Sequence, residues 1–524
     1  MTDRAPETAA APEGKAGIVF AIEPADLLTP VGAFLRLREH LPGAARNGFL
    51  LESIEGGQAR GRFSVIGLLP DLFWRCHGGR VEISGPGSGD VAAADASGPI
   101  ASLRAVIAAS RITLPAELPP MIGGVFGYLG YDMVRQMERL PDVPADDLAL
   151  PEAVMLRPSL FAVFDNVRDE LVLAVPVRCA AGEAPGQAEA RARALLASAR
   201  AVLSEGSGAA PGGAGAGVSP DALAEALAAL ASPRSNMERD GFLRAVRRIQ
   251  DYIAAGDAFQ VVPSQRFSAP FPLDPFALYR ALRRINPSPF LFFLEFDGFS
   301  LAGSSPEVLV RLRDGIVTVR PLAGTRRRGA DRAEDLALER DLLADPKERA
   351  EHLMLVDLGR NDVGRVAATG SVRVAESFVV ERFSHVMHIS STVEGRLRPE
   401  LDALDALVAG FPAGTLTGAP KIRAMEIIDE MEPTRRAAYA GCIGYFAPDG
   451  SMDTCIGLRM AVLKDGMMHV QAGAGVVADS DPDAEWEETR QKARALFRAA
   501  EAAIATCAPS AAGPGVAPAG AWRS

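Results

Sequence analysis

The amino-acid sequence predicts an α+β fold in which stacked antiparallel β-sheets are flanked by helices. Short apolar segments with strand composition follow one another in runs, and helical segments interrupt these runs at irregular intervals. Regular alternation of strand and helix would instead indicate a doubly wound parallel sheet. No internal repeat of fixed period is visible.

The sequence of 524 residues divides into five segments by composition. Residues 1–16 and 508–524 are rich in Ala and Pro and are expected to be a disordered leader and a disordered tail. Residues 17–179 are expected to form a β-rich N-terminal domain, and residues 238–507 a second domain. Between them, residues 180–237 hold one helix and a flexible linker rich in Gly, Ala and Pro.

In the N-terminal domain we expect a helix at residues 30–40. At residues 47–70 apolar and polar positions alternate around a Gly-Gly pair, which is typical of a hairpin. Residues 160–177 read as two more strands, joined by a turn at Asn166 to Asp169. This domain is therefore mostly β-structure.

The second domain opens with a helix whose apolar residues Phe242, Val246, Ile249 and Ile253 recur at helical spacing. Segments with strand composition follow, from FQVVPSQRF to MMHVQAGAGVV. Further helices are expected near residues 275–285, 331–344, 347–357, 400–409, 420–431 and 482–505.

The formal net charge of −11 argues against a nucleic acid or an anionic membrane as a partner. The five cysteines are scattered and show neither a CxxC pair nor a zinc-site spacing, which fits a reducing compartment. Neither a signal-peptide pattern nor a run of eighteen apolar residues occurs, so we expect a soluble cytoplasmic protein. An anionic substrate would need local positive charge or a metal ion.

Two pairs of glutamates are the strongest candidates for a metal site. Glu348 and Glu351 stand three residues apart in a helix opened by Pro346, and Glu485 and Glu488 repeat this spacing near the end of the chain. Carboxylates at this spacing repel unless a cation or a shared proton intervenes. One pair alone would more often be an exposed acidic edge, but two pairs on two helices could share one Mg²⁺.

Other motifs carry single candidate residues. Glu307 follows a strand in GSSPE, where it is either a held acid or a solvated turn residue. Gly324 and Thr325 in PLAGTRRRG could present donors to a carboxylate beside three arginines, although a solvated basic loop is equally compatible. In HVMH, His385 and His388 would point to opposite faces of a strand, so at most one is expected to be functional.

A Gly/Thr loop at residues 411–421 precedes a helix and could bind an anion at the helix start. It lacks the spacing of a Walker A loop. The segment QAGAGVVADSDP likewise offers Gly473 and Gly475 as positions of close backbone approach.

Together these segments resemble the chorismate-utilising enzymes, and most closely the anthranilate synthase component I family. GDAFQVVPSQRF, GSSPE, PLAGTRRRG, EHLMLVDLGRND, HVMH, GTLTGAPK, GLR, GAGVVADSDP and EWEETRQKA occur in the order found in the family. The resemblance implies the fold of that family, with the second domain as its chorismate-binding catalytic domain. It also implies formation of anthranilate and pyruvate from chorismate and ammonia in tryptophan biosynthesis.

The resemblance implies that Glu351 and Glu488 bind Mg²⁺, with Glu348 and Glu485 as second members of the acidic set. Chorismate carries two carboxylates, which four glutamates could accept only through a divalent cation. The residues that the family pattern assigns to binding chorismate are Gly324, Thr325, Tyr439, Arg459, Gly473, Ala474, Gly475 and Lys492.

For catalysis, the resemblance implies that Glu307 is the general acid at the departing C4 hydroxyl while ammonia attacks C2. His388 would carry the proton during pyruvate elimination, and Thr415 would lie near the ring. Gln260 stands where relatives that use water have a lysine, and Ala323 stands where many aminodeoxychorismate synthases have a nucleophilic lysine. Both positions favour anthranilate as the product.

The resemblance further implies a tryptophan site for feedback inhibition. Its residues are Leu51, Glu52, Ser53, Pro289, Phe290 and Leu291. The family more often has Tyr and Met at the last two positions, and a plain hydrophobic contact between sheets is the alternative.

The family takes ammonia from a glutamine amidotransferase subunit, so we expect a hetero-oligomer. Cys442 lies in a Gly-Cys-x-Gly segment but in an expected buried strand, without the context of an amidotransferase nucleophile. The enzymatic alternatives are an aminodeoxychorismate or an aminodeoxyisochorismate synthase component I. A non-catalytic, tryptophan-binding regulatory subunit is the alternative of another class, and the retained acids argue against it.

Overall fold

The structure, a computed structural model, describes residues 7–9, 17–55, 59–88, 98–180, 182–204, 217–383 and 386–507. His385, residues 205–216 of the expected linker and the expected tail at 508–524 lie outside the described residues. Most of the expected leader does so too. Its residues Glu7–Ala9 form β1, which pairs with β2 (Gly17–Pro24), so the expectation of a wholly disordered leader is wrong at this point. The edge of β2 offers backbone partners that sequence composition does not reveal.

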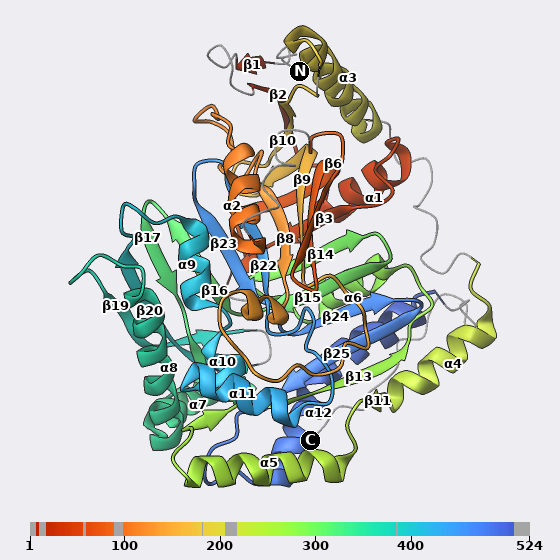
Figure 1. The fold of residues 1–524 in the computed structure, drawn as a ribbon. Coiled ribbons are helices and arrows are strands. Elements are labelled where there is room, and N and C mark those ends of the chain that lie inside the picture. Colours follow the sequence, from red (N-terminus) through yellow and green to blue (C-terminus); the bar gives the residue numbers. More distant parts are fainter. Residues whose placement is uncertain are drawn as a thin grey trace.

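The strands pair in antiparallel fashion, and helices cover the resulting layers, which confirms the predicted α+β class (Figure 1). Within the described ranges, 21 strands form one hydrogen-bonded network. Figure 1 shows β19 (Arg373–Arg382) and β20 (Val386–Arg396) on one side of the molecule beside α8 (Pro346–Gly364). β13 (Ser264–Pro270) and β25 (Met467–Gly473) lie near α12 (Pro482–Ala505).

The N-terminal half follows the predicted order closely. Thr29 caps the first helix by accepting a hydrogen bond from the backbone N–H of Gly32, and Pro30 occupies the first helical position. The predicted hairpin is present as the β3–β6 pair, although residues 56–58 at its turn are outside the described residues. The elements are α1 (Pro30–His40), β3 (Gly48–Glu52), β4 (Ile54–Glu55), β5 (Ala59–Arg60), β6 (Phe63–His77), β7 (Arg80–Ser84), α2 (Pro99–Ala109), β8 (Val125–Leu129), the 3₁₀ helix at Tyr131–Gln136, β9 (Ala153–Asp165) and β10 (Glu170–Val177).

The region expected to be a linker contains two helices. α3 (Pro185–Ser204) packs against β10, as expected for the single predicted helix. α4 (Pro220–Ala231) was missed, because the Gly- and Ala-rich composition masked its apolar spacing at Leu223, Ala226 and Leu230. These side chains pack into the buried cluster beside α12, so this part of the region is ordered by tertiary contacts.

The second half contributes the remaining elements, and the predicted helices are all found. They are β11 (Arg234–Ser235), α5 (Arg239–Ala254), β12 (Gln260–Val261), α6 (Pro275–Ile285), β14 (Phe290–Phe296), β15 (Phe299–Ser305), β16 (Val308–Arg313), β17 (Ile316–Val319), β18 (Leu322–Arg327), α7 (Arg332–Ala344), α9 (Ala403–Gly410), α10 (Gly414–Thr417), β21 (Gly418–Ala419), α11 (Lys421–Met431), β22 (Cys442–Phe446), β23 (Met452–Ile456) and β24 (Met460–Lys464).

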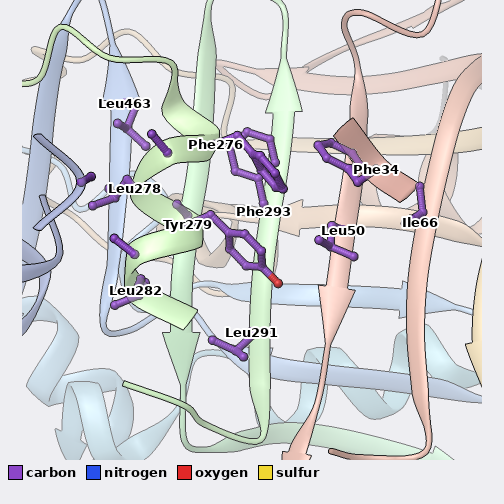
Figure 2. Close-up of a cluster of buried hydrophobic side chains, with 14 of the residues drawn as sticks. Phe34, Leu50, Ile66, Phe276, Leu278, Tyr279, Leu282, Leu291, Phe293 and Leu463 are labelled. Atoms are coloured by element: carbon purple, nitrogen blue, oxygen red, sulfur yellow. The ribbon is translucent and has the colours of Figure 1, made fainter. Parts of the chain in front are cut away.

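The two halves of the sequence share their sheets and their core. β3 pairs with β14, and β8 pairs with β22, so strands far apart in the chain are neighbours. Figure 2 shows Phe34 and Leu50 from the first half in one buried cluster with Phe276, Phe293 and Leu463 from the second. The sequence boundary at residues 180–237 therefore does not separate two independent cores. Hydrophobic periodicity identifies strands but not their partners, which is why the sequence suggested two separate units.

Candidate active site

The structure brings glutamates of α8 and α12 into one electrostatic environment. α8 begins as predicted, because the Asp345 carboxylate accepts hydrogen bonds from the first helical N–H groups and Pro346 follows. Burial raises the pKa of Glu351. The amide of Gln260 lowers it in part, and the charges of Glu348 and Glu488 raise it further. Burial also raises the pKa of Glu485, to which the charge of Glu488 adds.

Each acid of this cluster has a donor or a cation beside it. Lys492 Nζ lies 2.7 Å from Glu488 Oε1, and Arg326 Nη1 lies 3.0 Å from Glu348 Oε1. Gln260 donates from Nε2 to Glu351 Oε1 over 3.3 Å. Across the described ranges, His, Cys, Asp and Glu side chains form no group of three or more that is arranged as a metal site. The carboxylates are gathered, and the chain's own donors and cations face them.

Glu307 is a buried carboxyl group between β15 and β16. Its exposed fraction is 7%, and the N–H of Leu322 donates to Oε1 over 3.5 Å. Burial raises the pKa of Glu307 to about 8, although the Leu322 N–H, the Thr415 side chain and the Arg459 charge each lower it in part. A carboxyl group with this pKa holds its proton at neutral pH and can act as a general acid.

Arg459 is a half-buried cation close to Glu307 and Glu488. Burial lowers the pKa of Arg459, and the charges of Tyr439, Glu488 and Glu307 oppose this effect. Its guanidinium group forms no ion pair with any residue that the structure describes. A guanidinium group without a fixed carboxylate partner can bind a carboxylate of a ligand with two parallel hydrogen bonds.

Tyr439, Gly473 and Lys492 also come together. A Cβ atom on Gly473 would lie 3.0 Å from the Tyr439 hydroxyl and 2.8 Å from the Pro263 carbonyl oxygen, so only glycine allows this close approach. Lys492 donates from Nζ to the Gly473 carbonyl oxygen over 3.0 Å. The segment 473–475 therefore runs beside Tyr439.

His388 is held in a defined tautomer on β20. Its Nδ1 lies 2.8 Å from the carbonyl oxygen of Gly324 and 3.2 Å from the Thr325 hydroxyl. Because a carbonyl oxygen can only accept, Nδ1 must carry the hydrogen, which leaves the lone pair on Nε2. Burial lowers the pKa of His388 to about 4, with the nearby charges of Arg459 and Lys492 contributing. The imidazole is thus neutral at pH 7 and can accept a proton at Nε2.

Gly324, which accepts the hydrogen bond from His388, also lies beside the acid cluster. Its φ of +66° lies in the left-handed region, and a Cβ atom would lie 3.0 Å from Glu348 Oε2. One side chain of the site has an unpartnered atom: Gln260 Oε1 is buried and has no hydrogen-bond partner among the described residues. Buried polar atoms of this kind require an explanation, and a bound substrate is one.

The sequence matches the family described as chorismate binding enzyme over residues 63–498. The chain belongs to this family. It is 53% identical over 492 residues to anthranilate synthase component 1 of Cereibacter sphaeroides, a match that covers 93% of this chain and 95% of that protein. It is 47% identical over 492 residues to anthranilate synthase component 1 of Thermus thermophilus, with coverage of 92% and 97%.

Solved structures agree with this assignment. The crystal structure of anthranilate synthase component I from Streptococcus pneumoniae matches with a TM-score of 0.70 and 38% identity, covering 90% of this chain and 98% of that one. The menaquinone-specific isochorismate synthase from Escherichia coli matches with a TM-score of 0.67 and 19% identity, covering 95% and 96%, which shows the shared fold alone. The predicted resemblance to the chorismate-utilising enzymes is confirmed, as is the prediction of an enzyme. No helix within the described ranges is both long and apolar enough to span a bilayer.

In this chorismate-binding chain, the six residues expected to form a tryptophan site lie where two sequence-distant segments meet. Antiparallel pairing of β3 with β14 places Leu291 opposite Glu52, and Ser53 follows directly on β3. Pro289 and Phe290 are half-buried at the start of β14, whereas Leu291 is only 1% exposed and belongs to the core. Leu51 packs partly against a buried cluster of the opposite face.

The partners of Glu52 were not found by sequence reasoning. Its carboxylate accepts hydrogen bonds from the Tyr279 hydroxyl at 2.6 Å and from Arg283 Nε and Nη2 at 2.6 and 2.9 Å. Figure 2 shows Tyr279 on α6 within the apolar cluster, with its hydroxyl at the edge of the packed rings. Tyr279 and Arg283 are four residues apart, so both lie on one face of α6. This spacing is the feature of the sequence from which their shared position could have been predicted.

The three arginines of PLAGTRRRG pair with acids of α7 and α8. Arg326 Nε lies 2.7 Å from Asp341, its Nη2 lies 2.8 Å from Asp345, and its Nη1 reaches Glu348. Arg327 and Arg328 likewise pair with acids at the start of α7. Arg326 and Arg328 hold α7 and α8 against β18, so their guanidinium groups are not free to bind an anion, whereas the Arg327 side chain stays 66% exposed beside Glu334.

Proposed function

We propose that the protein is the aminating subunit of an anthranilate synthase, which converts chorismate and ammonia to anthranilate and pyruvate in tryptophan biosynthesis. The names of its relatives support this reaction. The observation that carries the proposal is the placement of Glu307, a buried acid whose pKa is raised to about 8, beside the unpaired cation Arg459. An acid that keeps its proton and a cation that lacks a carboxylate suit an anionic substrate with a hydroxyl leaving group.

Chorismate would bind through charge and backbone donors in an otherwise acidic chain. In this proposal Arg459 and Lys492 bind its carboxylates. The backbone of Gly473, Ala474 and Gly475, together with Tyr439, Gly324 and Thr325, surrounds the ring and the enolpyruvyl group. The close approach of Gly473 to Tyr439 supports this arrangement.

The acid cluster fits a Mg²⁺ ion in its chemistry. Burial raises the pKa of Glu351, and the charges of Glu348 and Glu488 add to this effect. A hard divalent cation would relieve the repulsion between these carboxylates while accepting oxygen ligands. Glu351 and Glu488 would hold the ion, with Glu348 and Glu485 beside them. When bound, Mg²⁺ would neutralise a substrate carboxylate that the glutamates alone would repel.

In the first half of the reaction, Glu307 would donate its proton to the C4 hydroxyl of chorismate. A C–N bond forms at C2, the ring double bonds shift, and the C4–O bond breaks with release of water. The unpartnered Oε1 of Gln260 can accept a hydrogen bond from the incoming ammonia, whereas a lysine at this position would activate water. Thr415 would contact the ring beside Glu307.

In the second half, the neutral Nε2 of His388 would take the proton from C2. The C–O bond to the enolpyruvyl group then breaks, that group leaves as pyruvate after gaining a proton, and the ring becomes aromatic. The hydrogen bond from Nδ1 to Gly324 supports this role, because it directs the lone pair to Nε2. Together with Ala323, which cannot act as a nucleophile, this step favours anthranilate over an aminodeoxychorismate as the product.

Regulation and nitrogen supply complete the proposal. Relatives are named component 1, which supports a hetero-oligomer with a glutamine amidotransferase subunit that supplies ammonia. Tryptophan would inhibit the enzyme by binding at the β3–β14 junction. Residues 17–179 would supply the β3 part of this tryptophan site, and residues 238–507 would form the chorismate site. The enzyme would act in the cytoplasm.

The test is anthranilate formation by the purified chain from chorismate, ammonium and Mg²⁺, followed by fluorescence and by mass analysis. We expect anthranilate and pyruvate in equal amounts, and loss of turnover with EDTA. Accumulation of an amino-chorismate would contradict the elimination step. The absence of any turnover would favour the alternative of a non-catalytic, tryptophan-binding regulatory subunit.

A further inference from the structure

A buried ion pair between Arg436 and Glu432 lies directly behind the candidate substrate site. Their side chains are 1% and 3% exposed. Arg436 donates from Nε to Glu432 Oε2 over 3.0 Å and from Nη2 to Oε1 over 2.6 Å. Glu432 Oε1 also accepts from the N–H and the hydroxyl of Ser264, at 2.7 and 2.8 Å. The carboxylate is thus fully bonded, which a buried charge requires.

The other N–H groups of Arg436 reach two backbone segments. Nη1 donates to the Leu416 carbonyl oxygen and Nη2 to the Val262 carbonyl oxygen, each over 2.7 Å. The guanidinium carbon also lies 5.6 Å from the centre of the Tyr439 ring. One side chain therefore links the backbone at Val262 and at Leu416 to the ring of Tyr439, three residues after it in the sequence.

Each of these segments carries a residue of the candidate site. Leu416 directly follows Thr415, and Val262 lies two residues after Gln260. The next residue, Pro263, accepts a hydrogen bond from the N–H of Ala474 over 3.1 Å and so fixes the 473–475 segment. Tyr439 itself lines that segment.

Only a planar, forked donor can make this set of bonds. A guanidinium group has five N–H donors in fixed directions, whereas a lysine ammonium is a single point on a flexible stem. A lysine could keep the charge pair with Glu432, but it could not also reach the carbonyl groups of Leu416 and Val262 in the same geometry.

We propose that Arg436 is a positioning residue, which acts through these contacts to hold Thr415, Gln260 and Tyr439 in one arrangement around the substrate. This inference rests on the proposed function, because it concerns the geometry of chorismate amination. Arg436 contacts the site from behind, so we do not assign it a chemical step.

The test compares Arg436→Lys with Arg157→Lys. Arg157 is a matched control because it is 5% exposed, binds the Asp71 carboxylate and donates to the Gly87 carbonyl oxygen, away from the site. We expect Arg436→Lys to lower kcat/KM for chorismate about 100-fold, divided between a higher KM and a lower kcat. Arg157→Lys should keep both parameters within about threefold of the wild-type values.

The rise in KM separates positioning from general destabilisation. Partial unfolding reduces the active fraction and hence the apparent kcat, but the folded remainder keeps its KM. The unfolding temperatures of both variants are measured alongside. A folded Arg436→Lys protein whose kcat/KM stays within about threefold of wild type would overturn the inference, as would a loss in kcat alone that follows the unfolding temperature.

Glu432→Gln keeps the test decisive if Arg436→Lys does not fold. This variant preserves the shape of the side chain and leaves both carbonyl contacts of Arg436 available, but it removes the charge that fixes the guanidinium group. We expect kcat/KM to fall about tenfold with KM raised, and an unchanged value in a folded protein would overturn the inference. Wild-type turnover is measured first: its absence would contradict the proposed function, whereas normal turnover with unaffected variants would contradict this inference alone.

Discussion

The acid cluster between α8 and α12 and the Glu52 carboxylate beside β14 use the same residue types in opposite ways. Glu52 receives three hydrogen bonds from Tyr279 and Arg283, all of 2.9 Å or less. Glu351 receives one, of 3.3 Å, from Gln260, whose own Oε1 has no partner in the described part of the chain. Glu52 uses its bonding capacity to link β3 to α6, whereas Glu351 keeps capacity for a ligand.

The largest effect expected from this contrast is that of Glu307→Gln. The amide keeps the shape of the side chain but cannot donate an acidic proton, so kcat should fall by about 10³-fold. Steady-state anthranilate formation measures the loss. Glu170→Gln, at the start of β10 where the side chain is 37% exposed, is the control and should retain full activity. Comparable activity in the Glu307 and Glu170 variants would remove Glu307 as the acid.

A second, smaller effect is expected from Glu488→Gln. Loss of one carboxylate should weaken Mg²⁺ activation and lower turnover by about 100-fold at a fixed Mg²⁺ concentration, because outer and inner ligands both affect metal affinity strongly. Activity is titrated against Mg²⁺, and tryptophan binding is followed by calorimetry. Tryptophan binding should survive, since Glu488 is remote from β3. An unchanged Mg²⁺ requirement would exclude Glu488 from the metal site.

The pH dependence of kcat/KM tests the same contrast with a smaller change. The general acid must be protonated, and the pKa of Glu307 is raised to about 8, so kcat/KM should fall tenfold per pH unit above about pH 8. The base must be neutral, and the pKa of His388 is lowered to about 4, so the acidic limb should lie near pH 4. The residual activity of Glu307→Gln should lack the alkaline limb. A wild-type alkaline limb below pH 6 would show that Glu307 is ionised at neutral pH.

The sequence predicted the candidate site better than the contacts that support it. The start of α8 could be predicted because Asp345, Pro346 and the following acids act within one helical turn. The pairing of β3 with β14 could not be predicted, since it joins residues about 240 positions apart and hydrophobic periodicity carries no information on partners. For the same reason the sequence suggested two domains where the structure has a shared core.

The contacts of charged residues are the second feature that could not be predicted from the sequence. The sequence places three arginines beside a possible carboxylate site in PLAGTRRRG, yet acids of α7 and α8 occupy the guanidinium group of Arg326. Arg436 was not singled out at all, because its partners Val262, Leu416 and Glu432 become neighbours only after folding. A sequence gives the types of the charged groups, whereas the fold decides which of them remain available.

The smallest effect on catalysis is expected from Glu52→Gln. This variant best distinguishes the role of the Glu52 network from that of the acid cluster. The amide loses charge-assisted hydrogen bonds from Arg283, which should lower the free energy of unfolding by about 2 kcal/mol. Because Glu52 is not in the acid cluster, kcat without tryptophan should change less than about threefold, while inhibition by tryptophan should weaken about tenfold. Chemical denaturation and inhibition curves on the same preparation measure both. A fall in kcat comparable to that of Glu488→Gln would show that the Glu52 network supports catalysis directly, and the contrast between filled and unfilled carboxylates would no longer separate the two regions.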